Sequence, residues 1–291
     1  MLKSNQKFSN KYTTANGASR AFVNFIGLKT LWLNTGTLCN LTCKGCYIES
    51  SPTNDKLLYL SLKDVEHYIN EILINNKSCK TIGFTGGEPF MNKDIIEILE
   101  LCLVKGFDVL VLTNAMQPMQ NKINNLKKLS KFKKLKLRVS LDHFCMSEHE
   151  KIRGKKTWNK ALRGIELLIN NNFNLNIASR ILYNDEQLIR DGFAKLFKLH
   201  NFKMNANDPN DLVLFPEMDS KFNTPEITTE CWNLLSVESK NMMCSDSRMI
   251  VKRKEDKQTH IVACTLIPHE NRFSYGHKLR NSFKKVYLNH P

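Results

Sequence analysis

Three cysteines stand close together in the stretch CNLTCKGCY, at Cys39, Cys43 and Cys46. Thiolates are ligands that both zinc and iron–sulfur clusters take from proteins, and tetrahedral zinc or a fully ligated cluster needs four of them. Three thiolates can hold three irons of a [4Fe–4S] cluster and leave the fourth iron open to a substrate or cofactor. The spacing C-x3-C-x2-C therefore favours a cluster with one open iron.

A zinc site is the alternative, with His67 or a distant cysteine as the fourth ligand. Zinc motifs usually pair two short C-x2-C elements, and the sequence shows no second tight pair. The odd total of nine cysteines, and an N-terminus (MLKSNQKFSNKY) without an apolar signal core, favour a reducing cytoplasm over a disulfide framework. No apolar run approaches the roughly 20 residues of a membrane helix.

The elements around the cysteine loop alternate between short β-type runs and amphipathic helical runs. Strands are predicted over 29–35, 80–85, 107–114, 134–142 and 173–182, and helices over 62–74, 93–104, 158–170 and 186–199. The pair Ser61 and Asp64 predicts a capped start for the first helix. Such alternation favours a parallel sheet wrapped by helices, with about six units before Pro216, fewer than a full eight-stranded barrel. The cysteine loop follows the first strand, on the face where barrel active sites collect.

We expect three parts: a polar lead-in over 1–28, a core over 29–216 and a C-terminal extension over 217–291. The extension loses the alternation, and 242–268 predicts two strands joined by a charged turn, with Cys244 before them and Cys264 after. Cys79, Cys102 and Cys145 are interpreted as packing or incidental residues.

The net charge of +15, from 43 basic and 28 acidic residues, is partly gathered in KKLSKFKKLKLR over 127–138. A basic balance can favour nucleic acid or another anionic partner. This run lacks the regularly interleaved aromatics of a single-strand binder. We therefore interpret the excess as lysines on solvated helix faces and do not expect a nucleic-acid partner.

Four motifs, in order, resemble those of the radical S-adenosylmethionine (SAM) enzymes. They are the cysteine triad followed by Tyr47, TGGEPF over 85–90, VSLDH over 139–143, and HEKIRGKKTWNKALRGIELL over 149–168. The last two are similar to the SLDG…IRG…ALxGIxxL stretch of the branch that contains molybdenum-cofactor biosynthesis enzymes and peptide maturases. The resemblance covers about 30–200, and it departs at His143, where that branch commonly has glycine.

The resemblance implies a partial (β/α)6 TIM-like barrel whose Cys39, Cys43 and Cys46 hold a [4Fe–4S] cluster. A reduced cluster would pass an electron to the sulfonium of SAM, giving methionine and a 5′-deoxyadenosyl radical that abstracts hydrogen from a substrate. It implies a low-potential electron donor of the flavodoxin or ferredoxin type. The substrate is either a peptide or protein, or a small anionic metabolite or nucleotide. A non-catalytic metal-binding module that contacts nucleic acid is the alternative from another class.

The resemblance also assigns SAM contacts. Gly86 and Gly87 would let the backbone approach a ligand, Glu88 would accept the methionyl ammonium and Pro89 would fix the turn, although a plain strand-to-helix turn explains the tetrad too. Other contacts would come from the ends of later strands, with each alternative a local structural role. Ser140 and Asp142 would contact the ribose or carboxylate of SAM, or else cap a helix. Thr113 and Asn114 would line the SAM pocket, or else form a turn. Arg153 and Arg180 would bind the SAM carboxylate, or else form surface ion pairs, and Tyr47 would lie against the adenine, or else pack under the loop.

The C-terminal part resembles the first portion of a SPASM/Twitch-like extension, which carries auxiliary clusters in peptide maturases. The fuller pattern has more cysteines beyond this point. Either the sequence is truncated, or an auxiliary cluster uses Cys231, Cys244 and Cys264 and again leaves an iron open. The alternative is a pair of cysteines that flank a hairpin acting as a lid on the barrel.

Overall fold

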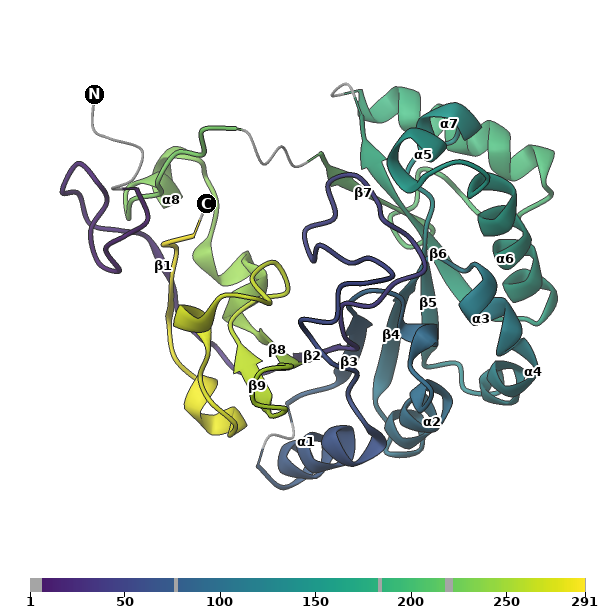
Figure 1. Cartoon of the computed structure of the whole chain (residues 1–291). Helices are drawn as coiled ribbons and strands as arrows, with labels where there is room; N and C mark the ends of the chain where they lie inside the picture. Colours follow the sequence, from purple (N-terminus) through teal and green to yellow (C-terminus); the bar gives the residue numbers. More distant parts are fainter. Residues whose placement is uncertain (1–6, 76–77, 183–184, 218–221, 291) are drawn as a thin grey trace.

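The central feature of the computed structural model, which describes residues 7–75, 78–182, 185–217 and 222–290, is an eight-stranded sheet (Figure 1). Its order is β7-β6-β5-β4-β3-β2-β8-β9, and every neighbouring pair is parallel except β8 with β9. The strands are β2 (Thr30–Asn34), β3 (Thr81–Thr85), β4 (Asp108–Thr113), β5 (Leu135–Ser140), β6 (Asn174–Ile181), β7 (Leu212–Pro216), β8 (Ser247–Lys252) and β9 (Thr259–Val262). The sequential order from β2 to β7 is what repeated βα units produce, so the predicted α/β class and parallel sheet are confirmed.

Helices join successive strands and cover one side of the sheet, called the outer face (Figure 1). They are α1 (Leu62–Asn75), α2 (Ile95–Val104), α3 (Gln117–Asn121), α4 (Ile123–Leu126), α5 (Met146–Arg153), α6 (Trp158–Asn170) and α7 (Glu186–Leu199). The predicted cap of α1 is present, because Ser61 N–H donates to Asp64 Oδ2 over 2.8 Å and Asp64 N–H donates to Ser61 Oγ over 3.2 Å. Helices α3, α4 and α5 and strand β7 were not predicted.

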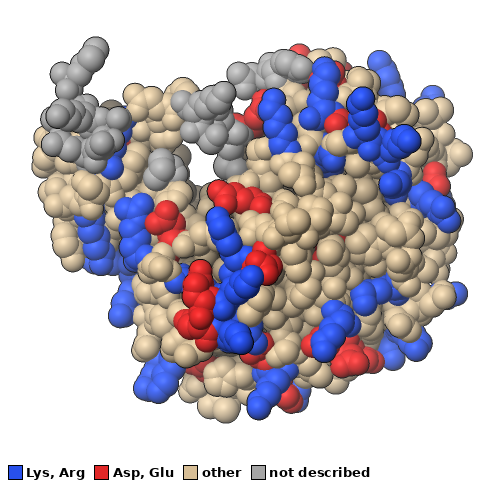
Figure 2. All heavy atoms as spheres, viewed as in Figure 1, with Lys and Arg blue, Asp and Glu red and all other residues tan. Residues whose placement is uncertain are grey.

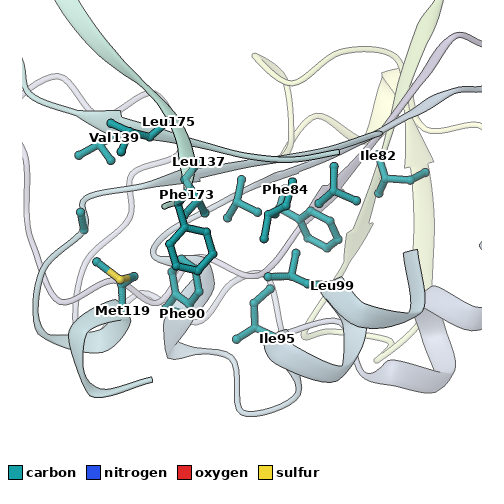
Figure 3. Close-up of a cluster of buried hydrophobic side chains, with 14 of the residues drawn as sticks. Ile82, Phe84, Phe90, Ile95, Leu99, Met119, Leu137, Val139, Phe173 and Leu175 are labelled. Atoms are coloured by element: carbon teal, nitrogen blue, oxygen red, sulfur yellow. The ribbon is translucent and has the colours of Figure 1, made fainter. Parts of the chain in front are cut away.

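The hydrophobic core lies between the outer face and the helices. Along β4 and β5 alternate residues are buried there, as the period of two requires, whereas β3 and β8 are buried at nearly every position. Figure 3 shows Phe84 and Ile82 of β3 and Leu137 of β5 facing Ile95 and Leu99 of α2. The residues between them on each strand project from the opposite, inner face, so one strand serves packing and the exposed chemistry at once.

The β8–β9 hairpin, predicted from the sequence, extends the main sheet at the edge strand β2. Leu31 of β2 pairs with Arg248 of β8, whose buried guanidinium donates to four backbone carbonyls, those of Ser282, Cys244, Ser247 and Lys284. The hairpin is therefore part of the sheet, and the alternative of a lid above the barrel is wrong.

The lead-in and the C-terminal part pack against each other. The short strands β1 (Phe22–Val23) and β10 (Val286–Tyr287) pair antiparallel. The C-terminal part also contains the short helix α8 (Cys231–Leu234). Arg20, 1% exposed, pairs with Glu226, which also accepts from Phe8 N–H. Residues 7–28 are mostly irregular, as predicted, but they are fixed by these contacts.

Within the described residues, no helix is both long enough and apolar enough to span a bilayer. Figure 2 shows lysine and arginine at many separate places on the visible face, several of them beside aspartate or glutamate. This view supports the interpretation of dispersed basic charge on solvated surface.

Candidate functional site

The cysteine loop, between β2 and α1, crosses the carboxyl ends of the parallel strands. Cys39 is buried, while Cys43 and Cys46 are half-buried. Successive bonds fix its path: Thr35 N–H donates to the Thr85 carbonyl at the end of β3 over 2.8 Å, and Lys44 N–H donates to the Ile152 carbonyl of α5 over 2.8 Å. The loop thus reaches from β3 to α5 across the carboxyl ends of the strands, where the sequence predicted it.

The three thiols of this loop are close enough to influence one another's ionisation. Burial raises the pKa of Cys39 to about 12, and a negative charge on Cys43 adds to the rise. Burial also raises the pKa of Cys43, where Arg153 acts in the opposite direction and Cys46 adds to the rise. Thiols in such surroundings stay protonated without a metal, and metal coordination is what deprotonates a ligand thiol.

The glycine pair of TGGEPF is required by the cysteine loop itself. A Cβ on Gly87 would lie 2.0 Å from the Leu38 carbonyl oxygen, and one on Gly86 (φ +125°) would lie 2.6 Å from the Gly36 carbonyl oxygen. Gly87 N–H donates to that Gly36 oxygen over 2.8 Å. Pro89 begins a 3-10 turn, Pro89–Met91, as its fixed φ favours. The close approach seen here is to the loop backbone, and contact of these glycines with a ligand stays a prediction.

Glu88 joins the ends of two strands and is 1% exposed. Its Oε1 accepts from Phe90 N–H (3.1 Å) and Thr113 Oγ1–H (2.8 Å), and its Oε2 accepts from Asn114 N–H (2.9 Å). Burial raises the pKa of Glu88 to about 6 against these bonds. Thr113 and Asn114 therefore lie beside Glu88, and Asn114 Nδ2 also donates to Asn40 Oδ1 of the cysteine loop over 2.9 Å. Their contact with a SAM pocket stays a prediction.

Asp142 lies between two arginines at the carboxyl end of β5. Arg153 Nε of α5 donates to Asp142 Oδ2, and Arg180 Nε of β6 donates to Oδ1 over 3.3 Å. Burial alone would raise the pKa of Asp142, but Arg153 and then Arg180 outweigh it and hold the pKa below its ordinary value. Two guanidinium groups and one carboxylate leave one positive charge beside Cys43. The arginines are partly buried, not the surface ion pairs of the alternative.

Ser140 ends β5 on the inner face and is half-buried. Neither it nor Asp142 caps a helix, because α5 begins at Met146, so that alternative is wrong. Tyr47 is 39% exposed. Burial raises the pKa of Tyr47, while a hydrogen bond with Thr85 acts in the opposite direction.

The sequence reasoning missed Asn34, the last residue of β2. Its Oδ1 accepts from Gly36 N–H over 2.9 Å, and its buried Nδ2 has no hydrogen-bond partner among the described residues. A buried donor without an acceptor is costly, so it fits a site completed by a polar ligand. Together with the thiols and the net positive charge, this donor set fits a metal cluster and an amino-acid-like cofactor.

The C-terminal cysteines are only partly brought together. Cys244 and Cys264 belong to one small apolar cluster, and a charge on Cys264 contributes to the raised pKa of Cys244 after burial. The Cys231 thiol instead contacts Thr228 Oγ1 at 3.5 Å, and that contact lowers its pKa. Among the described residues no three His, Cys, Asp or Glu side chains, those of the cysteine loop included, are arranged around a single metal ion.

The sequence model of the Radical SAM superfamily matches residues 33–190, which include the cysteine loop, Glu88 and Asp142. The match spans more than half of the chain, and the chain belongs to this superfamily.

Relatives and solved structures refine the comparison. The antilisterial bacteriocin subtilosin biosynthesis protein AlbA of Bacillus subtilis is 29% identical over 183 residues, 60% of this chain and 39% of AlbA. The putative peptide biosynthesis protein YydG of the same organism is 33% identical over 79 residues, 25% of this chain and 23% of YydG. The chain thus spans well under half of these relatives. SAM-bound anSMEcpe has the same fold, with a TM-score of 0.64 and 16% identity; the alignment covers 89% of this chain and 81% of anSMEcpe. SAM-bound SuiB of Streptococcus suis gives a TM-score of 0.62 with 12% identity, and the alignment covers 86% of this chain and 63% of SuiB.

Proposed function

We propose that this protein is a radical SAM enzyme that modifies a peptide substrate. Cys39, Cys43 and Cys46 would hold a [4Fe–4S] cluster with one open iron, and SAM would bind between that iron and the ends of β3 to β6. The observation that carries the proposal is the meeting of the cysteine loop, in which Cys43 lies near both Cys39 and Cys46, with the Asp142 clamp on one sheet edge.

When reduced and loaded with SAM, the cluster supplies a 5′-deoxyadenosyl radical that removes a hydrogen atom from the substrate. The chain's own residues bind and orient. Glu88, with a pKa of about 6, is mostly ionised at pH 7, and its bonds to three donors leave one of about four lone-pair sites for an ammonium. The surplus positive charge of Arg153 and Arg180 over Asp142 suits a carboxylate.

A peptide is the substrate class that we favour. The names of AlbA and YydG describe bacteriocin and peptide biosynthesis, and both are aligned to parts of this chain. A small anionic metabolite is the second candidate, supported by the molybdenum cofactor biosynthesis protein 1 of Drosophila melanogaster, 28% identical over 141 residues. A flavodoxin- or ferredoxin-type donor would supply the electron, and Cys244 and Cys264 would contribute to an auxiliary cluster of a SPASM/Twitch-like extension.

Iron content and absorbance after anaerobic reconstitution test the cluster assignment. We expect wild type to take up iron and sulfide, and Cys43→Ser to lose most of both. Cys145→Ser is the matched control, because Cys145 is exposed and outside the loop. Equal iron in Cys43→Ser and wild type would contradict the assignment. Stimulation of 5′-deoxyadenosine formation by peptides rather than nucleotides would then separate the two substrate classes.

A further inference from the structure

Arg138 lies on the inner face of the sheet, directly beneath the site. It precedes Ser140 by two residues on β5, so it is about 7 Å deeper along the strand. Its neighbours in register are Leu112 of β4 and Asn176 of β6. The inner face is thus continuous from the Asp142 clamp down to this guanidinium.

Within the part of the chain that the structure describes, the charge of Arg138 has no counter-charge. Its Nε donates to Asn176 Oδ1 over 3.2 Å, and within the described ranges Nη1 and Nη2 have no acceptor and the side chain has no carboxylate partner. Burial lowers the pKa of Arg138, and no neighbouring charge offsets this effect. A partly desolvated cation without a partner costs stability, and proteins keep such groups chiefly where a ligand completes them.

The surroundings of Arg138 form a basic hollow. A cavity of about 280 Å³ at the amino ends of β3 to β6 is lined by Arg138 together with Lys136, Lys133 and Lys134. Its one acidic lining residue, Asp108, is already 3.9 Å from Lys134. On the inner face of β2, in register with Gly83, Leu110 and Lys136, the Trp32 indole lies so closely over Gly83 that a Cβ there would be 2.4 Å from the ring.

We propose that Arg138 binds a carboxylate of the peptide substrate inside the half-barrel. This inference rests on the proposed function and adds to it the charge that the substrate carries. The two terminal nitrogens form a planar fork that matches one carboxylate, and a single guanidinium balances a single negative charge. A glutamate or aspartate side chain and a C-terminal carboxylate offer the same chemistry.

The test measures retention of labelled peptide pools on the immobilised, reconstituted full chain. Acetylated and amidated random hexapeptides carry either Glu or Gln at the third position. We expect wild type to retain the Glu pool about tenfold more than the Gln pool. Arg138→Met should retain the two pools equally. Lys133→Met, which removes an exposed charge from the cavity rim, should behave as wild type.

Further measurements distinguish a side-chain carboxylate from a C-terminal one, and a ligand-binding role of Arg138 from a structural role. Strong retention of a free-acid Gln pool assigns the C-terminal carboxylate, whereas retention of the amidated Glu pool alone assigns a side chain. The melting temperature of Arg138→Met should be unchanged or higher, because a partly buried, unpaired charge is removed. Equal retention by wild type of the amidated Glu pool, the amidated Gln pool and the free-acid Gln pool, including no retention of any of them, overturns the proposal. So does a persistent Glu preference, or a clear loss of stability, in Arg138→Met. The proposed function is judged separately, by 5′-deoxyadenosine formation in wild type.

Discussion

Gly87→Ala tests how the sheet holds the cysteine loop. The added Cβ would lie 2.0 Å from the carbonyl oxygen and 2.6 Å from the carbonyl carbon of Leu38, where ordinary contact begins at 3.4 Å. Both atoms belong to the backbone, so no side-chain rotation relieves the clash. The loop must move by about 1.4 Å just before Cys39, the first cluster ligand.

The expected cost follows from these contacts. Overpacking of this kind costs about 1–3 kcal/mol. The shift also disrupts the bonds from Gly87 N–H to the Gly36 oxygen (2.8 Å) and from Glu88 N–H to the Leu38 oxygen (3.2 Å), each contributing about 1 kcal/mol. The total is about 3–5 kcal/mol, which lowers the melting temperature of a chain of this size by about 5–8 °C.

Thermal unfolding of the apoprotein, and iron content after reconstitution, are the assays. We expect Gly87→Ala to lower both. The matched control is Gly106→Ala, where nothing lies within 4 Å and only the positive φ of +87° opposes a side chain, at about 1–2 kcal/mol. This control should unfold slightly earlier than wild type and load iron normally. If Gly87→Ala melts within a degree of wild type and takes up as much iron, the described packing of the loop is refuted.

Three further predictions follow from buried charges and thiols. The pKa of Glu88 is about 6 in the folded apoprotein against 4.5 ordinarily, so its contribution to the free energy of unfolding is fully present below pH 4.5 and falls by about 2 kcal/mol as pH rises to about 6. Urea unfolding of wild type against Glu88→Gln should show this fall, and a pH-independent difference would contradict it. Asp142→Asn leaves its two arginine partners without a carboxylate and should cost about 3–5 kcal/mol in the same assay; Asp55→Asn, at an exposed ion pair, should cause no measurable change. Replacing both Cys244 and Cys264 with Ala should lower the iron content if they hold an auxiliary cluster, and unchanged iron would leave them as packing residues.

Local sequence patterns predicted the elements with a strong apolar period. The bounds of α6 and α7 match the predicted ranges, because each has one buried stripe at helical spacing. Helix α5 was missed because MSEHEKIR is polar and buries only His149 and Ile152. The docking of β8 on β2 could not be predicted, since a pairing between residues more than 200 positions apart is absent from any local pattern.

The site was predicted in its residues more than in its contacts. The motif order placed the cysteines, Glu88 and Asp142 at the carboxyl ends of the strands, where the structure has them. The sequence could not show that Gly87 is fixed by Leu38 rather than by a ligand, because that clash depends on the path of the loop. Asn34 was missed because an asparagine after a strand is ordinarily a turn residue. Only its burial and unpaired Nδ2 identify it.

The most direct test of the central claim is release of 5′-deoxyadenosine by anaerobically reconstituted protein given SAM and a strong reductant. We predict formation by wild type and by Cys102→Ala, whose buried thiol lies on α2 outside the site, and none by Cys46→Ala. If iron-loaded wild type formed none, or if Cys46→Ala formed as much as wild type, the account of this site as a radical SAM centre would be contradicted.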